Sequence, residues 1–371
     1  MSTPIYRRLS YILFIVALFA GLLGGCAPTV EEPTAPPTEA PAETITVTDA
    51  RGREVTFEEP PRRIVIAGRA NFMLNDAVYL FPEARERVIG LAEATQETDW
   101  LDLIDPGIDE KARFPFDAGA EEIAALNPDL VLLKSFMAEP LGNAVEELGI
   151  PVVYLDLETP EQYYRDLAIL GALFDAPERA AELTAFYQNS LDEIETALEG
   201  LEEEEKPQVL LMHYDTRGDE AAFKVPPESW IQTWMVEFAG GRPVWENSGG
   251  GWNVVNLEQL AAWNPDKIFV ISYFTDVDGV AAMLQSDPLW QSLEAVQAGE
   301  LYAFPKDYYS WDQPDSRWIL GLKWLAQRLH PESFAELDVM EEVYTFYEEL
   351  YGIDRPAVDE VIVPRLQGDV E

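Results

Sequence analysis

The sequence is poor in the side chains that most enzymes and metal sites use. Among 371 residues it has one cysteine, Cys26, and two histidines, His213 and His330. A lone cysteine cannot form an intramolecular disulfide, so the fold depends on its hydrophobic cores. Two histidines argue against a site for bare zinc or manganese, and we predict no metal site in the protein itself.

The motifs of common enzymes are absent as well. There is no Gly-x-Ser-x-Gly, no His-Glu-x-x-His and no Walker loop, and the run Gly249–Gly251 is not followed by Lys-Ser or Lys-Thr. Without a nucleophile and base, or a metal with three ligands, the usual catalytic sets cannot be assembled. We therefore predict that the chain is not an enzyme and that it holds no cofactor.

Positive charge is also scarce. The chain has 25 lysines and arginines against 68 aspartates and glutamates, which gives a formal net charge of −43. Such an acidic surface repels nucleic acid, so we expect no nucleic-acid partner. A basic docking partner and adaptation to a salty or acidic surrounding would both account for this charge.

The N-terminus differs in kind from the rest. Arg7 and Arg8 precede Tyr11–Leu23, an uncharged apolar run that is shorter than the about 20 residues of a membrane span. A basic start, an apolar stretch and small residues predict a signal peptide over 1–25. The Leu-Gly-Gly ahead of Cys26 resembles the lipobox of bacterial lipoproteins, which implies a diacylated cysteine and an extracytoplasmic protein anchored to the membrane. An ordinary secretory signal with an incidental cysteine is the alternative.

The next segment, 26–44, consists mainly of Pro, Thr, Ala and Glu. It cannot bury much apolar area, so we predict a disordered tether.

Beyond residue 45, short β-branched runs alternate with helical patterns in two series, which predicts parallel sheets covered by helices. The first series has strands at Ile64–Ala67, Arg87–Leu91, Leu130–Leu133 and Val152–Leu155. The second has strands at Gln208–Met212, Lys267–Ile271 and Leu301–Phe304.

The two series share a short internal sequence repeat. Residues 120–133 read AEEIAALNPDLVLL and residues 257–270 read LEQLAAWNPDKIFV, with six identical positions that include Asn-Pro-Asp. Proline ends a helix and the flanking Asn and Asp cap the turn, so each copy predicts a helix, a turn and a strand. Two copies indicate two lobes of like design.

A regular apolar spacing between the series predicts one long helix over 177–201. The expected architecture is α/β, with two Rossmann-like lobes and parallel sheets joined by that helix. We predict an N-terminal lobe over 45–160, connecting helices over 161–206, a C-terminal lobe over 207–352 and a tail over 353–371.

The whole arrangement resembles a known family. The opening TVTDARGREVTFEEPPRRIVI (Thr46–Ile66), the Asn-Pro-Asp turns, LGIPVVYLD (Leu148–Asp156) and the lipobox are similar to the periplasmic-binding proteins of ABC importers that carry ferric siderophores, haem or cobalamin. The resemblance implies a monomer with the ligand between two lobes. It also implies that one acidic residue on each lobe docks onto the permease, and the matching positions here are Asp76 and Glu237.

Ligands of open α/β sheets bind beyond the carboxyl ends of the strands, which selects the candidate site residues. Scarce cations at such ends or in nearby loops predict an anionic ligand, and aromatic residues predict flat cleft walls. For Trp252 and Trp311, core and cleft positions are both open, and His213 could touch ligand or satisfy a turn. The candidates are Arg69, Arg113, Lys134, His213, Tyr214, Arg217, Lys224, Trp230, Trp252, Tyr273, Tyr309 and Trp311.

We therefore predict a solute-binding lipoprotein of an ABC importer that captures a metal chelate or an oxyanion. A ferric siderophore ranks first, so the ligand itself would contain iron. Cobalamin, haem, and molybdate or tungstate are the alternatives, and a sensor or interaction lipoprotein without transport is the alternative class.

Overall fold

The first two strands form a small sheet of their own, which precedes the N-terminal lobe in the sequence. In the computed structural model, which describes residues 44–94, 96, 98–217 and 220–370, β1 (Ile45–Thr48) and β2 (Glu54–Phe57) pair antiparallel. The predicted signal peptide, Cys26 and the tether apart from Thr44 lie outside the described residues. Of Arg217 and Glu220 only the backbone is described.

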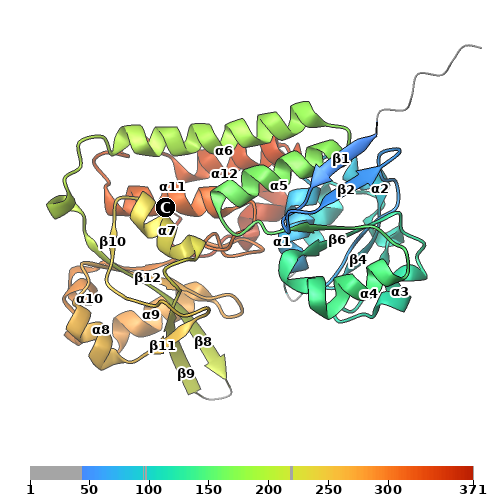
Figure 1. The fold of residues 1–371 in the computed structure, drawn as a ribbon. Helices are drawn as coiled ribbons and strands as arrows, with labels where there is room; N and C mark the ends of the chain where they lie inside the picture. Colours follow the sequence, from blue (N-terminus) through green and yellow to red (C-terminus); the bar gives the residue numbers. More distant parts are fainter. Residues whose placement is uncertain (1–43, 95, 97, 218–219, 371) are drawn as a thin grey trace, which may run out of the picture. The chain divides into compact units, whose positions relative to one another are not determined.

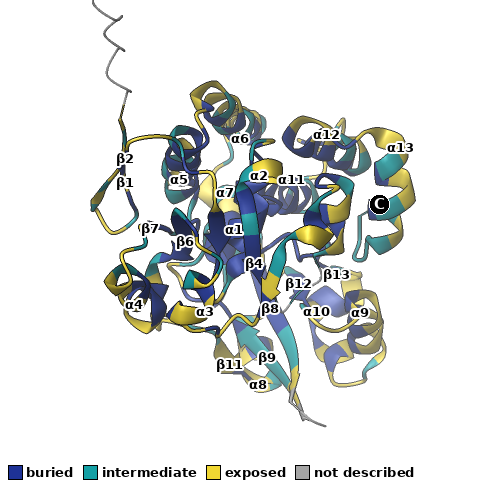
Figure 2. Cartoon of the chain, turned by 90° about the vertical axis from the view of Figure 1, so that its right-hand side faces the viewer, coloured by how far each residue is buried: buried dark blue, intermediate teal, exposed yellow. Residues whose placement is uncertain are grey.

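The N-terminal lobe is built on a five-stranded sheet in which every pair is parallel, in the order β5-β4-β3-β6-β7. Its buried centre consists of apolar runs, as expected for a sheet covered on both faces, and Figure 2 shows β4, β6 and β7 mostly dark blue. The strands are β3 (Ile64–Ile66), β4 (Val88–Ala92), β5 (Ala112–Phe114), β6 (Leu130–Lys134) and β7 (Val152–Leu155). The helices are α1 (Asn71–Val78), α2 (Ala84–Arg87), α3 (Ala120–Ala124) and α4 (Asn143–Glu147).

The C-terminal lobe has a mixed sheet, in the order β11-β9-β8-β12-β13, with β10 beside β8. β8, β12 and β13 pair in parallel as predicted, whereas β9 pairs antiparallel with both of its neighbours, β8 and β11. The strands are β8 (Gln208–Arg217), β9 (Glu220–Val225), β10 (Arg242–Pro243), β11 (Asn253–Val255), β12 (Lys267–Ile271) and β13 (Leu301–Ala303). The helices are α7 (Ile231–Phe238), α8 (Leu257–Trp263), α9 (Val277–Ser286), α10 (Glu294–Ala298), α11 (Trp318–Leu329), α12 (Val339–Tyr351) and α13 (Arg355–Ala357).

The hairpin of β8 and β9 corrects the predicted end of the strand at Met212. Residues His213 to Arg217 stay in the ladder because they pair with Lys224 to Glu220 of β9. Lys224 and Val225 are therefore the last residues of β9.

The internal sequence repeat corresponds to two similar turns between a helix and a strand. Asn127 and Asn264 both adopt a left-handed conformation, with φ of 57° and 45°, at the turn between helix and strand, where Asn is tolerated better than most residues. In each copy the following Asp ties this turn to the neighbouring strand. Asp129 accepts hydrogen bonds from the amides of Arg62 and Arg63 at 2.8 and 2.9 Å, and Asp266 accepts one from Gln208 at 2.7 Å.

The long helix lies between the two sheets in sequence. α6 (Pro177–Ala197) begins at the predicted residue, and α5 (Pro160–Leu173) precedes it. With 21 residues α6 is about 32 Å long at 1.5 Å per residue, and it packs against α5 and α11 (Figure 1). It ends four residues before the predicted Leu201, since Gly200 adopts a positive φ of 89°. None of the described helices combines the length and apolar character that a bilayer crossing requires.

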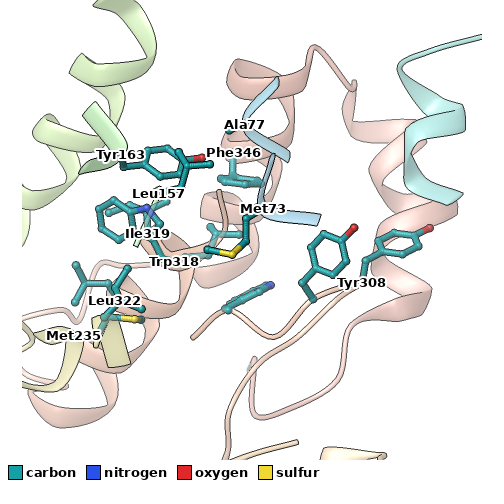
Figure 3. Close-up of a cluster of buried hydrophobic side chains, with 14 of the residues drawn as sticks. Met73, Ala77, Leu157, Tyr163, Met235, Tyr308, Trp318, Ile319, Leu322 and Phe346 are labelled. Carbon is teal, nitrogen blue, oxygen red and sulfur yellow. The ribbon is translucent and has the colours of Figure 1, made fainter. Parts of the chain in front are cut away.

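Apolar side chains of both lobes share one core beside α11. Met73 and Ala77 of α1 and Leu157 after β7 belong to the same cluster as Trp318 and Leu322 of α11 (Figure 3). All five are buried. The apolar contact between the lobes is therefore part of the folded core.

Candidate ligand-binding cleft

A buried ion-pair network joins the lobes beneath the cleft. Arg317, at the start of α11, contacts Asp76 of α1 through Nη1 and Asp307 through Nε at 2.7 Å. Its guanidinium also lies over the rings of Tyr309 at 4.9 Å and Trp100 at 5.1 Å. Burial raises the pKa of Asp76, and the nearby Arg317 opposes this by favouring the charged carboxylate.

This network corrects three site predictions. Asp76 has no exposed surface, so it cannot offer its carboxylate to a permease. Trp311 is fully buried and its indole donates to Asp307 at 3.2 Å, while Tyr309 is 1% exposed beneath Arg317. Tyr309 and Trp311 follow β13 in the sequence, as predicted, and Asp76, which the resemblance assigned to docking, lies within α1; all three are buried between the lobes.

An open pocket of about 390 Å³ lies above the network, between the lobes. Its size suits a small-molecule site. The N-terminal lobe contributes Ala70, Phe72, Met73 and Glu158, and the C-terminal lobe contributes Ser229, Trp230, Ile231, Gln232, Trp252, Tyr273, Gln313 and Pro314. Glu158 is the one residue in this lining with a full charge.

Three predicted site residues, Trp230, Trp252 and Tyr273, line the C-terminal side of this pocket, and His213 packs against two of them without being part of the lining. The His213 ring lies 4.4 Å from Tyr273 and 5.1 Å from Trp252, and Trp230 meets Trp252 edge-on at 5.5 Å. They come from β8, the end of β12 and two loops. Edge-on and tilted contacts of this kind favour a rigid arrangement of rings, so the cluster gives the pocket a pre-formed aromatic wall.

A buried carboxyl fixes this wall from behind. Asp312 accepts a hydrogen bond from the Tyr273 hydroxyl at 2.8 Å and from Gln232 Nε2 at 3.1 Å. Burial raises the pKa of Asp312 to about 6, although its three side-chain hydrogen-bond partners favour the charged form. Tyr273 and Gln232 are thereby held at the pocket wall.

Burial also determines the protonation state of His213. It lowers the pKa of His213 to about 4, against a smaller opposing effect of Asp215. The imidazole is therefore neutral at pH 7 and packs against the rings of Trp252 and Tyr273.

The predicted convergence of cations on one cleft is wrong for the described side chains. Lys134 is buried and pairs with Glu158 at 2.7 Å, and Lys224 pairs with Asp215. Arg69 lines a separate groove beside Phe136, and Arg113 lines a hollow with Asp99, Asp102 and Asp109. Acidic side chains are abundant enough in this sequence to neutralise most cations locally, which spacing along the chain cannot reveal. The side chain of Arg217 lies outside the described part.

The remaining candidates divide between cleft and surface. Tyr214 is half-buried against Phe223, with ring centroids 5.8 Å apart, and is not part of the pocket lining. Glu237, near the end of α7, is exposed as docking requires. Among the described residues no group of three or more His, Cys, Asp or Glu is arranged to hold a metal ion.

Several residues of the pocket lining were not among the predicted site residues. Gln232 and Gln313 lie in the pocket, and Gln96 reaches across from the N-terminal lobe to bond Gln313 at 2.9 Å. The one feature of the sequence that could have indicated these glutamines is their position near an aromatic loop or a strand end. Phe72 and Met73 belong to α1, which begins four residues after Ala67.

Comparisons with known proteins place the chain in a family. It matches the family described as Periplasmic binding protein over residues 103–308. The molybdate-binding protein MolA of Haemophilus influenzae is 25% identical over 334 residues, covering 82% of this chain and 90% of that protein. A vitamin B12-binding protein of Vibrio parahaemolyticus is 23% identical over 253 residues, covering 62% of this chain and 86% of that protein.

A solved structure shares the fold. The periplasmic solute binding protein from Veillonella parvula has a TM-score of 0.68 at 21% identity, covering 86% of this chain and 97% of that one. Because the family match spans more than half of its residues, this chain belongs to the periplasmic binding protein family, as a solute-binding protein of ABC transporters rather than an enzyme.

Proposed function

We propose that the inter-lobe pocket binds a metal chelate, a ferric siderophore, and that the protein hands it to its permease. The observation that carries the proposal is the aromatic wall of Trp230, Trp252 and Tyr273, against which the neutral His213 packs. Such a wall buries large apolar ligand faces at little entropic cost. A chelate presents an organic shell to the protein and hides its metal charge, so it needs no ring of ionic partners.

An oxyanion is the second candidate, because the relative that covers 82% of this chain is named a molybdate-binding protein. A bare oxyanion is recognised by cations or several N–H donors. The described residues of the pocket lining include no Lys or Arg, which favours the chelate at this position. Cobalamin is a third candidate, on the similarity to a vitamin B12-binding protein.

A ligand panel tests the proposal. Tryptophan fluorescence of the purified protein would be titrated with ferrichrome, ferric aerobactin, cyanocobalamin, haemin and sodium molybdate. We expect submicromolar quenching by a ferric chelate and at least about tenfold weaker binding in Trp252→Leu, because the wall loses its central ring. Trp263→Phe removes an indole on α8 outside the lining and is the matched control. A response to molybdate with none to any chelate would overturn the proposal.

We further propose that diacylated Cys26 anchors the protein outside the cytoplasm. Two acyl chains would hold it at the membrane stably, and Cys26→Ala is expected to release the protein into the soluble fraction. Retention of the variant in the membrane fraction would contradict the anchor.

A further inference from the structure

The inter-lobe pocket has one acidic side chain and no basic one among its described lining residues. Glu158 lies on the N-terminal side with 48% of its side chain exposed, and the other lining residues are neutral. This is the opposite of the charge that the sequence predicted for the cleft. A pocket with this lining attracts a positively charged group and repels an anion.

The ion pairs behind Glu158 leave a negative charge on this side of the pocket. Lys134 is 1% exposed, bonds Glu158 Oε1 at 2.7 Å and also donates to the carbonyl of Asp156. Arg165 pairs with Asp156 and Asp166 at 3.0 and 2.8 Å. The connected group therefore has two cations against three carboxylates. Because Lys134 is buried, the exposed part of Glu158 carries the remaining negative charge to the pocket.

A second carboxylate lies behind the opposite wall. Asp312 has no exposed surface, and it accepts hydrogen bonds from Tyr273 and Gln232, which both line the pocket. The partners of Asp312 among the described residues are neutral, so no nearby cation balances its charge. A buried charge is poorly screened, and it acts on a ligand beyond the side chains that cover it.

The rings of the pocket form a corner. Trp230 and Trp252 lie at 89° to each other with centroids 5.5 Å apart, and Tyr273 lies at 66° to Trp252 with centroids 6.3 Å apart. The face of an aromatic ring attracts cations, and rings arranged around one space form the cages that recognise alkylammonium groups. The rings and the carboxylates therefore favour the same kind of ligand group.

A hydrogen-bond acceptor without a partner lies in the same wall. Gln232 is 3% exposed and its Nε2 donates to Asp312, so Oε1 has no hydrogen-bond partner among the described residues. A buried acceptor of this kind is costly unless a ligand or water meets it. An ammonium group brings N–H donors, whereas a carboxylate brings only acceptors.

We propose that the bound chelate carries a positive charge, an ammonium group that lies in this pocket beside Glu158 and the rings of Trp230 and Trp252. The inference rests on the proposed function and narrows it to cationic chelates. The two carboxylates attract the charge, the indole rings contact the ammonium and its alkyl neighbours, and Gln232 Oε1 accepts a hydrogen bond.

Two ferric hydroxamates that differ in one charge test the inference on the purified full chain. Ferrioxamine B has a free terminal ammonium group, and ferrioxamine E is its uncharged cyclic counterpart. We expect tryptophan quenching to show at least about tenfold tighter binding of ferrioxamine B by the wild type. Glu158→Gln should remove most of this difference and Asp312→Asn should reduce it, while the affinity for ferrioxamine E stays unchanged.

Further variants separate charge from folding. Glu158→Asp keeps the carboxylate and should retain a preference for ferrioxamine B. Glu195→Gln removes an exposed carboxylate of α6 outside the lining and should change neither affinity. Because Glu158→Gln leaves Lys134 with one partner fewer, circular dichroism would verify that each variant is folded. Asp312→Asn lowers the negative charge without disturbing that ion pair.

The outcomes separate the inference from the function. If both ferrioxamines bind the wild type equally tightly, the chelate function stands and the cation site is wrong. A preference for ferrioxamine B that neither Glu158→Gln nor Asp312→Asn changes would also overturn the site.

If no chelate binds, the chelate function is wrong, and choline measured against its uncharged isostere 3,3-dimethylbutan-1-ol decides the cation site. Binding of choline alone, weakened in Glu158→Gln, supports the site. Equal or absent responses to the two probes overturn it.

Discussion

His213 illustrates how one side chain depends on its surroundings. It is 6% exposed among Trp252, Tyr273 and the end of β9, and burial lowers its pKa from 6.5 to about 4. The unfolded chain therefore binds a proton between these values when the folded chain does not. The stability contributed by the neutral imidazole is full above pH 6.5 and is lost as the pH falls towards 4.

This linkage gives a prediction at the residue scale. His213→Phe keeps a ring packed against the wall and removes the titration, so the fall in unfolding free energy between pH 6.5 and 4 should shrink by up to ~3 kcal/mol. Urea denaturation at several pH values measures it. Tyr214→Phe, at the neighbouring position, should keep the wild-type profile, and an unchanged profile in His213→Phe would contradict the prediction.

At the scale of single elements, the position of α11 depends on its close packing against a neighbouring loop. A Cβ at Gly321 would lie 2.3 Å from the Trp311 carbonyl oxygen, a backbone atom that cannot move away cheaply. Glycine lets the helix approach the loop that carries Trp311 and Asp312. The loop thereby reaches both the buried network and the aromatic wall.

Gly321→Ala should therefore destabilise the protein by about 2 kcal/mol or more, because overpacking shifts the helix from the loop. Gly250→Ala is the control, since nothing lies within 4 Å of its Cβ position. Thermal unfolding monitored by circular dichroism would compare the two, and equal melting temperatures would contradict the packing argument.

At the scale of the whole molecule, Arg317 ties the lobes together. It is fully buried and holds Asp76 from the N-terminal lobe and Asp307 from the C-terminal lobe. Arg317→Met leaves these carboxylates buried without a counter-charge, which should cost about 3–5 kcal/mol. Urea unfolding measures the loss. Arg355→Gln breaks an exposed pair with Glu341 and should have little effect.

Docking to a permease is our second proposal for the whole molecule. Glu237 is exposed near the end of α7, whereas Asp76 is buried. Glu237→Arg should reduce uptake of the ligand by cells and leave the affinity of the purified protein unchanged, because α7 presents this carboxylate away from the pocket lining. Normal uptake in this variant would exclude Glu237 as a docking residue. Glu258→Arg on α8 is a control for surface charge reversal.

The sequence by itself determined the features that arise from local physics. Apolar runs of about five residues gave the parallel strands, the heptad-like spacing gave α6, and Asn-Pro-Asp gave two equivalent turns because proline and left-handed Asn end a helix within a few residues. Tyr273 lies just beyond the end of β12, as predicted, whereas His213 lies within β8 and Trp252 comes just before β11.

Only the tertiary structure decided which of those positions reach the cleft. Tyr309 and Trp311 have the same local signals as lining residues, and the family resemblance assigned Asp76 to docking, yet packing between the lobes buries all three. The pairing of Lys134 with Glu158 and of Lys224 with Asp215 depends on contacts across loops and strands. Burial and ion pairing are properties of neighbours in space, and for these residues the decisive neighbours are distant in sequence or lie across a hairpin.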